Sequence, residues 1–256
     1  YGIVQIGGVR RDISDEQRAL VEKGLDYYQG LLDQMATLFL KDSTILMRCR
    51  GHGILSGDDA RLLCTVGPTA RASGLNMDVR QDYPYCAYGD LDVKAILPPP
   101  ETGGPQGDVY DRIIVRLLEV GQSIGIIRQC LGQLPAGEIL WEPKMAKLLS
   151  VLKKAEGEGI GRVEAPRGEC MHYVKMAGKE APDSWKVKAS SYSNLMSWIP
   201  MLQGEQLADI PIIVASIDPC LSCTDRVAVT RNGRSAILTK EDLTRLSREK
   251  TRRMMQ

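Results

Sequence analysis

Residues 108–134 have the sequence DVYDRIIVRLLEVGQSIGIIRQCLGQL and predict a long buried helix. Apolar side chains recur in this stretch at intervals of three and four residues, which is the period of one helix face. They are Ile113, Ile114, Leu117, Leu118, Ile124, Ile127 and Leu131. The proline and glycine cluster at residues 98–105 comes just before, and it cannot lie inside a helix or a central strand, so it is a connector.

A second long helix is predicted from Ser14 to about Leu40. Ser14 is a good N-cap residue, and Gln17 stands at the capping-box position three residues later. Leu20 and Leu25 belong to an apolar stripe that begins directly afterwards. The two long helices together predict a two-helix core.

The rest of the chain predicts shorter elements. Residues 58–66 predict a weak helix that Gly67 and Pro68 interrupt, and residues 76–92 predict an irregular, ordered loop. Residues 171–176 and 185–188 alternate enough between apolar and polar side chains to favour a β-hairpin. The predicted fold class is α+β and mainly helical, with a long-helix core and small β pieces.

Composition excludes some function classes. The chain has 256 residues, is 43% hydrophobic and carries a formal charge of +1, so it can bury a core and has no broad basic surface for nucleic acid. No interval approaches the roughly 18 apolar residues of a spanning helix. Seven cysteines without a secretory signal favour a reducing compartment, the cytoplasm. Because the chain starts with Tyr1 in what resembles the middle of a strand, we expect a fragment.

The most informative local motif is the cysteine pair in DPCLSC, residues 218–223. Two thiolates three residues apart can bind one soft metal ion or form a redox dithiol, so the pair alone leaves half a zinc site, a dithiol and another metal equally open. Zinc needs further ligands, and His52 and His172 each stand alone. Isolated cysteines are usually small buried apolar residues; here they are Cys49, Cys64, Cys86, Cys130 and Cys170.

The wider motif SIDPCLSCTDR, residues 216–226, resembles the C-terminal metal-binding signature of nickel–iron hydrogenase large subunits. Three further segments resemble the same group and the homologous large peripheral subunit of complex I: GGVR at 7–10, VGPTARASG at 66–74 and EAPRGE at 164–169. Arg226 stands where uptake hydrogenases place a histidine, as in the membrane-associated, complex-I-like group. The resemblance implies an N-terminally truncated catalytic subunit of that group.

The resemblance implies a role for each cysteine of the pair. Cys220 corresponds to a terminal nickel ligand, and in this family that thiolate is a candidate proton acceptor. Cys223 corresponds to a thiolate that bridges nickel and iron. The other two metal-binding cysteines of the family belong to a motif expected before Tyr1, so the chain is expected to hold half of the metal site.

Three further site residues follow from the same resemblance. Arg167 corresponds to an arginine above the open coordination position, Asp218 to a residue just outside the metal ligands, and Ser191 to a hydroxyl that contacts an iron-bound cyanide. Ser190 stands where the family usually has proline. Without the resemblance, Arg167 would be an ordinary ion-pair arginine, Asp218 a helix N-cap and Ser191 a turn residue.

The implied activity is heterolytic splitting or formation of hydrogen at a nickel–iron centre whose iron carries cyanide and carbon monoxide. The implied partners are an iron–sulfur small subunit with a [4Fe-4S] cluster, membrane antiporter-like subunits and a maturation endopeptidase, and magnesium is a further implied ion. Residues 1–226 would form the catalytic domain on the inner face of the cell membrane, and residues 227–256 a tail that maturation removes.

Two alternatives remain open. The first is a complex-I-like NADH:quinone oxidoreductase subunit or non-catalytic scaffold without the metal, and Cys220 and Cys223 argue against it because such subunits generally lack that pair. The second is a stand-alone zinc or dithiol protein, which accounts for the cysteines but for none of the other motifs. A permanent basic helix is the alternative for the C-terminal tail.

Overall fold

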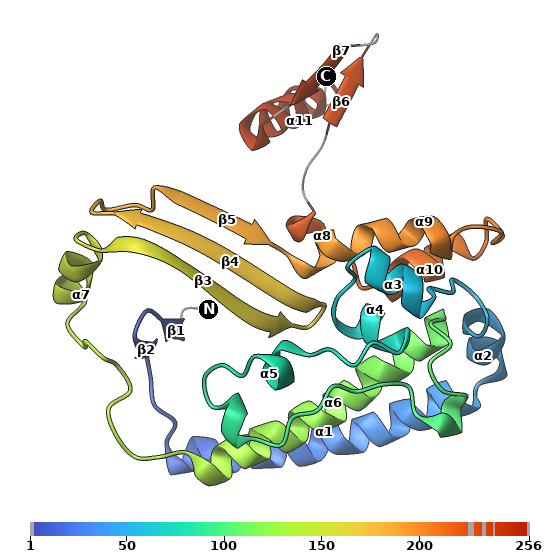
Figure 1. The fold of residues 1–256 in the computed structure, drawn as a ribbon, viewed down its shortest axis with the longest axis horizontal. Coiled ribbons are helices and arrows are strands. Elements are labelled where there is room, and N and C mark those ends of the chain that lie inside the picture. The colour runs from blue at the N-terminus through green and yellow to red at the C-terminus, as the bar shows by residue number, and fades with distance from the viewer. Residues whose placement is uncertain (1–2, 225–227, 232–233, 238, 255–256) are drawn as a thin grey trace. The chain divides into compact units, whose positions relative to one another are not determined.

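The computed structural model describes residues 3–224, 228–231, 234–237 and 239–254. The chain divides into two compact units, Tyr1–Pro219 and Cys220–Gln256. The first unit contains the long helices and a three-stranded sheet, and the second contains a two-stranded hairpin followed by a helix (Figure 1).

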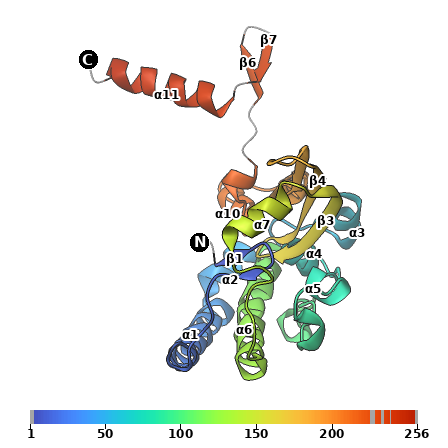
Figure 2. The same ribbon diagram turned by 90° about the vertical axis from the view of Figure 1, so that its left-hand side faces the viewer.

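Two long helices, α1 (Asp15–Lys41) and α6 (Val109–Gln133), lie side by side in the first unit (Figures 1 and 2). Arg128 pairs with Asp26 at 2.7 Å, a contact between the late part of α6 and the early part of α1, so the helices run antiparallel. Leu25 of α1 packs in one cluster with two side chains of α6, Ile124 and Leu131. The predicted pairing of the two long helices is confirmed, but the larger cluster of buried side chains joins α6 to short helices and not to α1.

Both helix starts are capped by side chains. Ser14 and Gln17 form the predicted capping box at the start of α1, each side chain bonded to the other residue's backbone N–H. At the start of α6 the Asp108 carboxylate accepts a hydrogen bond from the Asp111 N–H at 2.8 Å.

Three short helices pack against α6: α2 (Ser43–Cys49), α4 (Gly67–Ala72) and α10 (Ile210–Ser216). Further short helices contact these helices, the sheet or one another: α3 (Gly57–Leu62), α8 (Ser190–Asn194), η3 (Leu195–Ser197) and α9 (Trp198–Met201). Arg112 of α6 is fully buried and joins several of these segments, because its guanidinium donates to the Gly107 and Gly53 carbonyls and to Ser216 Oγ at 2.7, 2.7 and 2.8 Å. A buried guanidinium with several acceptors is a strong cross-link.

The weak helix predicted at residues 58–66 is α3, and it already ends at Leu62, before the predicted break at Gly67-Pro68-Thr69. A new helix, α4, begins at Gly67, with Pro68 in its first turn. Proline is favoured there because a first-turn N–H has no partner within the helix. The predicted loop at residues 76–92 holds two short helices, α5 (Val79–Asp82) and η1 (Tyr88–Asp90).

The sheet consists of β3 (Glu156–Ala165), β4 (Gly168–Ala177) and β5 (Ser184–Lys188), all antiparallel and in that order. The predicted hairpin is the β4–β5 pair. Strand β3 was not predicted, since the glycines in EGEGIGRVEA interrupt any alternation. Two smaller strands and a helix complete the first unit: β1 (Val4–Gln5), β2 (Gly8–Val9) and α7 (Met145–Leu152), with η2 (Pro100–Thr102) in the predicted connector.

The second unit contains η4 (Leu221–Cys223), the hairpin strands β6 (Ala228–Arg231) and β7 (Arg234–Ile237), and α11 (Lys240–Met254). About half of the described residues lie in helices and the sheets are small and antiparallel, so the predicted α+β, mainly helical fold class is confirmed. Within the same described ranges, none of the helices combines the length and the apolar character needed to cross a bilayer.

Candidate functional site

Arg167 lies at the tip of the β3–β4 hairpin. Ala165 pairs with Gly168, so Pro166 and Arg167 form a two-residue loop. The Arg167 side chain donates from Nε to the Asp218 carbonyl at 2.5 Å and from Nη2 to Asp218 Oδ1 at 3.0 Å. The structure therefore brings together two of the predicted site residues that are 51 positions apart in the sequence.

Asp218 follows α10 and has a left-handed backbone with φ of 53°. Such a conformation costs a non-glycine residue about 1 kcal/mol or more and persists where the surroundings hold it. Its N–H donates to the Ala215 carbonyl at 2.8 Å, and Arg167 bonds both its carbonyl and its carboxylate. Asp218 is thus a partner of Arg167, and the N-cap interpretation does not describe it.

The hairpin tip docks against the start of α4 at two glycines. A Cβ added to Gly67 would lie 2.4 Å from the Gly168 Cα, and one added to Gly168 would lie 2.5 Å from the Gly67 N. Both residues also have positive φ, 66° and 118°. The motifs at 66–74 and 164–169 thus meet in space at a contact that only glycine permits.

Asn194 connects the same two segments. Its side chain accepts from the Val66 N–H at 2.9 Å and donates to the Val66 and Arg167 carbonyls at 3.2 and 3.3 Å. It is fully buried in α8. Ser191 lies in the same short helix and is also fully buried, while Ser190, at the position where proline was expected, is 5% exposed. The predicted hydroxyl therefore belongs to the helix that fixes the Arg167 backbone.

The cysteine pair lies in the second unit. Cys220 is the N-cap residue of η4 and Cys223 is its last residue, and their Sγ atoms are 2.9 Å apart. This separation exceeds the disulfide bond length of about 2.05 Å and is well within twice a typical metal–sulfur bond of about 2.3 Å. Ser222 Oγ lies 3.1 Å from Cys220 Sγ. Two sulfurs so placed fit a soft metal as a pair of ligands, whereas Arg226 lies outside the described residues.

A buried ion cluster behind the hairpin was not predicted. The Arg71 side chain is 1% exposed and pairs with Glu119 at 2.7 Å, Glu164 at 2.9 Å and Asp78 at 3.5 Å. Arg80 also pairs with Asp78, at 2.7 Å. Burial raises the pKa of both Glu119 and Glu164, and the attraction of Arg71 offsets part of that rise.

A cavity of about 330 Å³ lies beside this cluster and is lined by members of it and by Asp218. Arg116 and Glu119 of α6 also line it, as does Pro166 of the hairpin tip. Sequence reasoning missed Arg116 and Glu119, although a signal was present. Together with Arg112 and Ser123 they recur at helical spacing within a helix predicted to be buried, and charged side chains on such a face need an explanation.

His52 belongs to an ion-pair group away from these residues. Its Nδ1 lies 2.9 Å from Glu205 Oε2 and 3.9 Å from Asp209 Oδ2, and the three ligand atoms are close enough for a metal ion. Asp209 is already paired with Arg48 at 2.8 Å, and Glu205 accepts from the Gly53 N–H at 2.7 Å. With both carboxylates so engaged, the group serves as a cross-link of the fold.

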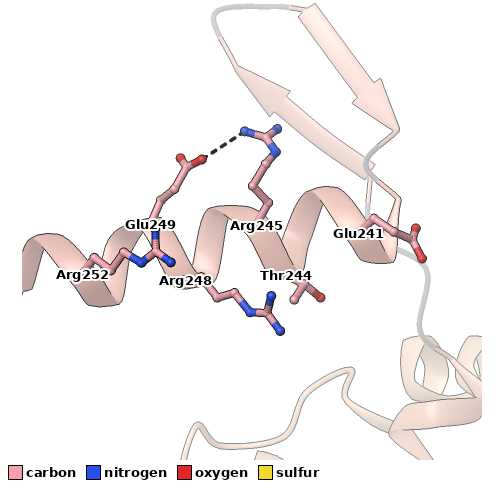
Figure 3. A pocket seen from close by; sticks show the side chains of 6 residues that line it. All are labelled: Glu241, Thr244, Arg245, Arg248, Glu249 and Arg252. Atoms are coloured by element: carbon pink, nitrogen blue, oxygen red, sulfur yellow. Dashed lines mark hydrogen bonds and ion pairs between the residues drawn. The ribbon is translucent and has the colours of Figure 1, made fainter.

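A second hollow, of about 390 Å³, runs along α11 (Figure 3). Arg245 pairs there with Glu249 at 3.3 Å, one helix turn further on. All six lining side chains belong to this one helix: Glu241, Thr244, Arg245, Arg248, Glu249 and Arg252. This hollow is the solvated face of a helix rich in basic side chains.

Comparison with known proteins identifies the family. The family described as respiratory-chain NADH dehydrogenase, 49 Kd subunit, matches residues 1–226. The membrane-bound hydrogenase subunit alpha of Pyrococcus furiosus is 44% identical over 98% of the chain, and the carbon monoxide-induced hydrogenase of Rhodospirillum rubrum is 38% identical over 86%. An NADH-quinone oxidoreductase subunit of Dehalococcoides mccartyi is 33% identical over 88%.

The chain spans 60%, 58% and 59% of the lengths of these three relatives. They are oxidoreductases of two kinds, hydrogenases and quinone oxidoreductases, and the resemblance to the complex-I-like hydrogenases found in the sequence is confirmed. The chain belongs to the family of the 49 kDa subunit of respiratory-chain NADH dehydrogenase.

Proposed function

We propose that the chain is the catalytic subunit of a membrane-associated nickel–iron hydrogenase. It would oxidise hydrogen or reduce protons, and pass electrons to or from an iron–sulfur small subunit. The observation that carries the proposal is the convergence of Cys220 and Cys223, with 2.9 Å between their sulfurs, in a chain 44% identical to a membrane-bound hydrogenase subunit.

The two thiols fit half of the ligand set of a nickel–iron centre, because thiolates bind both metals. Cys220 would be a ligand of nickel, and Cys223 would be a ligand that both metals share. When bound, such a centre supplies the redox chemistry that takes hydrogen apart. The relatives are longer than this chain, so we assign the remaining ligands to the complete protein.

Arg167 would serve this site as a fixed cation. Its guanidinium is oriented by the Asp218 carboxylate, and Asn194 holds its backbone carbonyl. Only Pro219 separates Asp218 from Cys220 in the sequence, so their Cα atoms can be no more than about 7 Å apart. A guanidinium anchored so near in the chain would stabilise thiolates and negative charge that develops at the site. Ser191 would supply a buried hydroxyl in the same wall.

A second candidate is a complex-I-like quinone oxidoreductase subunit without metal. The 33% identity to the NADH-quinone oxidoreductase subunit of Dehalococcoides mccartyi supports it. In that case Cys220 and Cys223 would have no ligand role, and a quinone would be the substrate. The two candidates differ in one measurable property, the retention of nickel.

The complete protein, produced with its partner subunits and maturation proteins, tests the proposal. Nickel and iron are measured by elemental analysis, and activity by hydrogen-dependent reduction of a dye. We expect the wild type to retain nickel and Cys220→Ser to lose both nickel and activity. Cys64→Ser is the matched control, because Cys64 is an exposed cysteine outside the site, and it should retain both. A wild type without nickel would favour the second candidate.

The partner assignments belong to the same proposal. One relative is a membrane-bound hydrogenase subunit. We therefore propose that the chain lies peripherally on the inner face of the membrane, beside a small subunit with a [4Fe-4S] cluster and antiporter-like membrane subunits. Residues 1–226 would form the functional domain. An endopeptidase would remove residues 227–256 after metal loading, and magnesium is a further ion we propose for the mature protein.

A further inference from the structure

We infer that Glu119 is a proton carrier and that the cavity beside it is a hydrated passage between Glu119 and the Arg167–Asp218 pair. The inference rests on the proposed function, which releases or consumes protons near Arg167. It concerns residues on α6 that neither the motifs nor the proposed metal ligands include.

The cavity has the right position and lining for such a passage. Its volume of about 330 Å³ has room for several water molecules, each of which occupies about 30 Å³. Its walls come from separate parts of the first unit: α4, α5, α6, the β3–β4 hairpin and Asp218, which follows α10. The polar lining includes Arg116, Glu119, Ser123, Glu164 and Asp218.

Arg116 places at the cavity buried N–H groups that need hydrogen-bond acceptors. One of its nitrogens, Nη1, donates to the Arg112 carbonyl at 2.9 Å. Its Nε and Nη2 atoms are buried and have no acceptor within the ranges that the structure describes. Buried donors are almost always paired with protein or with ordered water, and both atoms belong to a residue that lines the cavity. Water in the cavity would satisfy them.

Glu119 is the carboxyl best placed to exchange protons with that water. Its Oε1 accepts from Arg71 Nε at 2.7 Å, which leaves Oε2 to take up a proton. Its side chain is 16% exposed, whereas the Glu164 side chain is 4% exposed and uses both oxygens, on Arg71 and on the Val79 N–H. Burial raises the pKa of Glu119 towards the range in which a carboxyl can both accept and release a proton.

The charges around Glu119 tolerate its protonation. Four arginines and four carboxylates of the described residues surround or line the cavity, so their charges balance when all are ionised. They are Arg71, Arg80, Arg116 and Arg167, and Asp78, Glu119, Glu164 and Asp218. A proton on Glu119 leaves a single positive charge in the cluster, and Arg71 remains paired with Glu164 and Asp78.

The transfer itself involves protons only. One hydrogen molecule yields two protons and two electrons, and the electrons leave through the iron–sulfur partner of the proposed function. A proton that reaches cavity water binds Glu119 Oε2, forming an O–H bond and a neutral carboxyl. That bond breaks when the proton passes to solvent water at the exposed edge of the side chain, which restores the carboxylate. Proton reduction runs through the same steps in reverse.

Infrared difference spectroscopy and kinetics on the complete enzyme complex test the inference. We expect a carbonyl band of a protonated carboxyl that titrates above the ordinary glutamate pKa of about 4.3 and is missing in Glu119→Gln. With nickel content unchanged, hydrogen oxidation by Glu119→Gln should fall about 100-fold, with a larger solvent deuterium isotope effect. Glu119→Asp should restore part of the rate.

Asp78→Asn is the matched control. Asp78 belongs to the same Arg71 cluster but does not line the cavity. This variant should lower the melting temperature while keeping the Glu119 band and the wild-type isotope effect. A nickel-loaded complex in which Glu119→Gln has the wild-type rate, pH profile and isotope effect would overturn the inference.

The infrared titration needs no metal, which separates this inference from the proposed function. A complex that binds no nickel yet shows the titrating Glu119 band refutes the hydrogenase proposal and supports a protonatable Glu119. A nickel-loaded, active complex without that band refutes the role of Glu119 alone.

Discussion

Arg167 uses the geometry of its guanidinium twice on one partner. Nε bonds the Asp218 carbonyl and Nη2 bonds the Asp218 carboxylate, so the planar group is held in one orientation. A lysine carries the same charge but is a single flexible ammonium that cannot reproduce both directed bonds. Orientation, rather than charge alone, is what the arginine adds.

The substitution Arg167→Lys should therefore keep the positive charge and remove the fixed orientation of the guanidinium. We expect nickel to be retained and hydrogen-dependent dye reduction to fall at least about 10-fold, the loss that follows from about 1.4 kcal/mol of weaker transition-state stabilisation. Arg162→Lys, in the same hairpin, is the control. The Arg162 side chain is 43% exposed, 3.5 Å from the Glu169 carboxylate and 5.1 Å from the centre of the Tyr83 ring, and it makes no contact with Asp218. Equal activity of both variants with the wild type would contradict the prediction.

Gly67→Ala tests the contact between the hairpin tip and α4. The new methyl group would lie 2.4 Å from the Gly168 Cα, and alanine disfavours the φ of 66°. We expect a loss of about 2–4 kcal/mol in the free energy of unfolding, measured by denaturant titration. Gly161→Ala in β3 should change it little, since nothing lies within 4 Å of its added Cβ. Comparable losses in the two variants would refute the packing argument.

At the residue level, sequence reasoning reached Arg167, Asp218, Ser191 and the two cysteines only because family motifs contain them. The pairing of Arg167 with Asp218 depends on a contact between residues 51 positions apart, which no local pattern encodes. Glu119 was missed for a related reason. Arg71, which neutralises the buried charge of Glu119, lies on a different helix. The pairing can therefore be recognised only from the packing of α4 against α6.

Among the elements, α6 combines two functions along its length. Its apolar side chains build the core with α1, while Arg112, Arg116 and Glu119 carry charge on a buried face. Its first turn is buried as well. Asp111 is 1% exposed there, and its Oδ2 accepts from the Gln106 and Gly107 N–H groups at 2.5 and 3.0 Å.

Asp111 predicts a pH dependence of stability. Burial raises the pKa of Asp111 to about 6, with a further rise from the nearby Asp108 carboxylate. In the unfolded chain its pKa is about 3.9, so between about pH 4 and pH 6 the folded state binds more protons. Its contribution to stability is therefore complete below pH 4 and is lost as the pH rises through 6.

Asp111→Asn should remove that dependence. Asparagine keeps an acceptor oxygen but does not titrate, so the variant should not lose the roughly 1.4 kcal/mol per pH unit that the wild type loses near pH 5. The measurement is the free energy of unfolding of both proteins at pH 4.5, 5.5 and 6.5. Parallel curves for the two proteins would show that Asp111 is not the group responsible.

The elements with regular periodicity were predictable, and the others were not. Helices α1 and α6 carry long apolar stripes and side-chain caps, and the β4–β5 hairpin alternates, so local physics was sufficient. Strand β3 has a backbone that pairs with β4 over its full length, but its glycines supply no alternating side chains. Helix α4 begins at a Gly-Pro pair. Such a pair breaks a helix when it lies in the interior and is favoured when it lies in the first turn, so the sequence alone does not decide between the two.

On the scale of the whole molecule, the chain divides into two compact units after Pro219, and the family match ends at residue 226. We expect a variant of the complete protein that ends at Arg226 to keep the melting temperature of the first unit within about 2 °C, measured by calorimetry. The long-helix core lies entirely in Tyr1–Pro219, so the deletion removes none of its packing. A fall of several degrees would show that residues 227–256 are needed to stabilise the core.

The hydrogen bonds of Asn194 also determine when, during synthesis of the chain, the start of α4 can become fixed. Its side chain is the partner of Val66, which precedes it by 128 residues. At about 5–20 residues per second, the ribosome adds Asn194 about 6 to 26 seconds after Val66. The start of α4 and the hairpin tip therefore lack the hydrogen bonds of Asn194 during much of synthesis, and the backbone of Arg167 is fixed only late. Under the proposed function, a metal delivered before that moment would meet an unfinished site, so cofactor insertion would follow translation of α8.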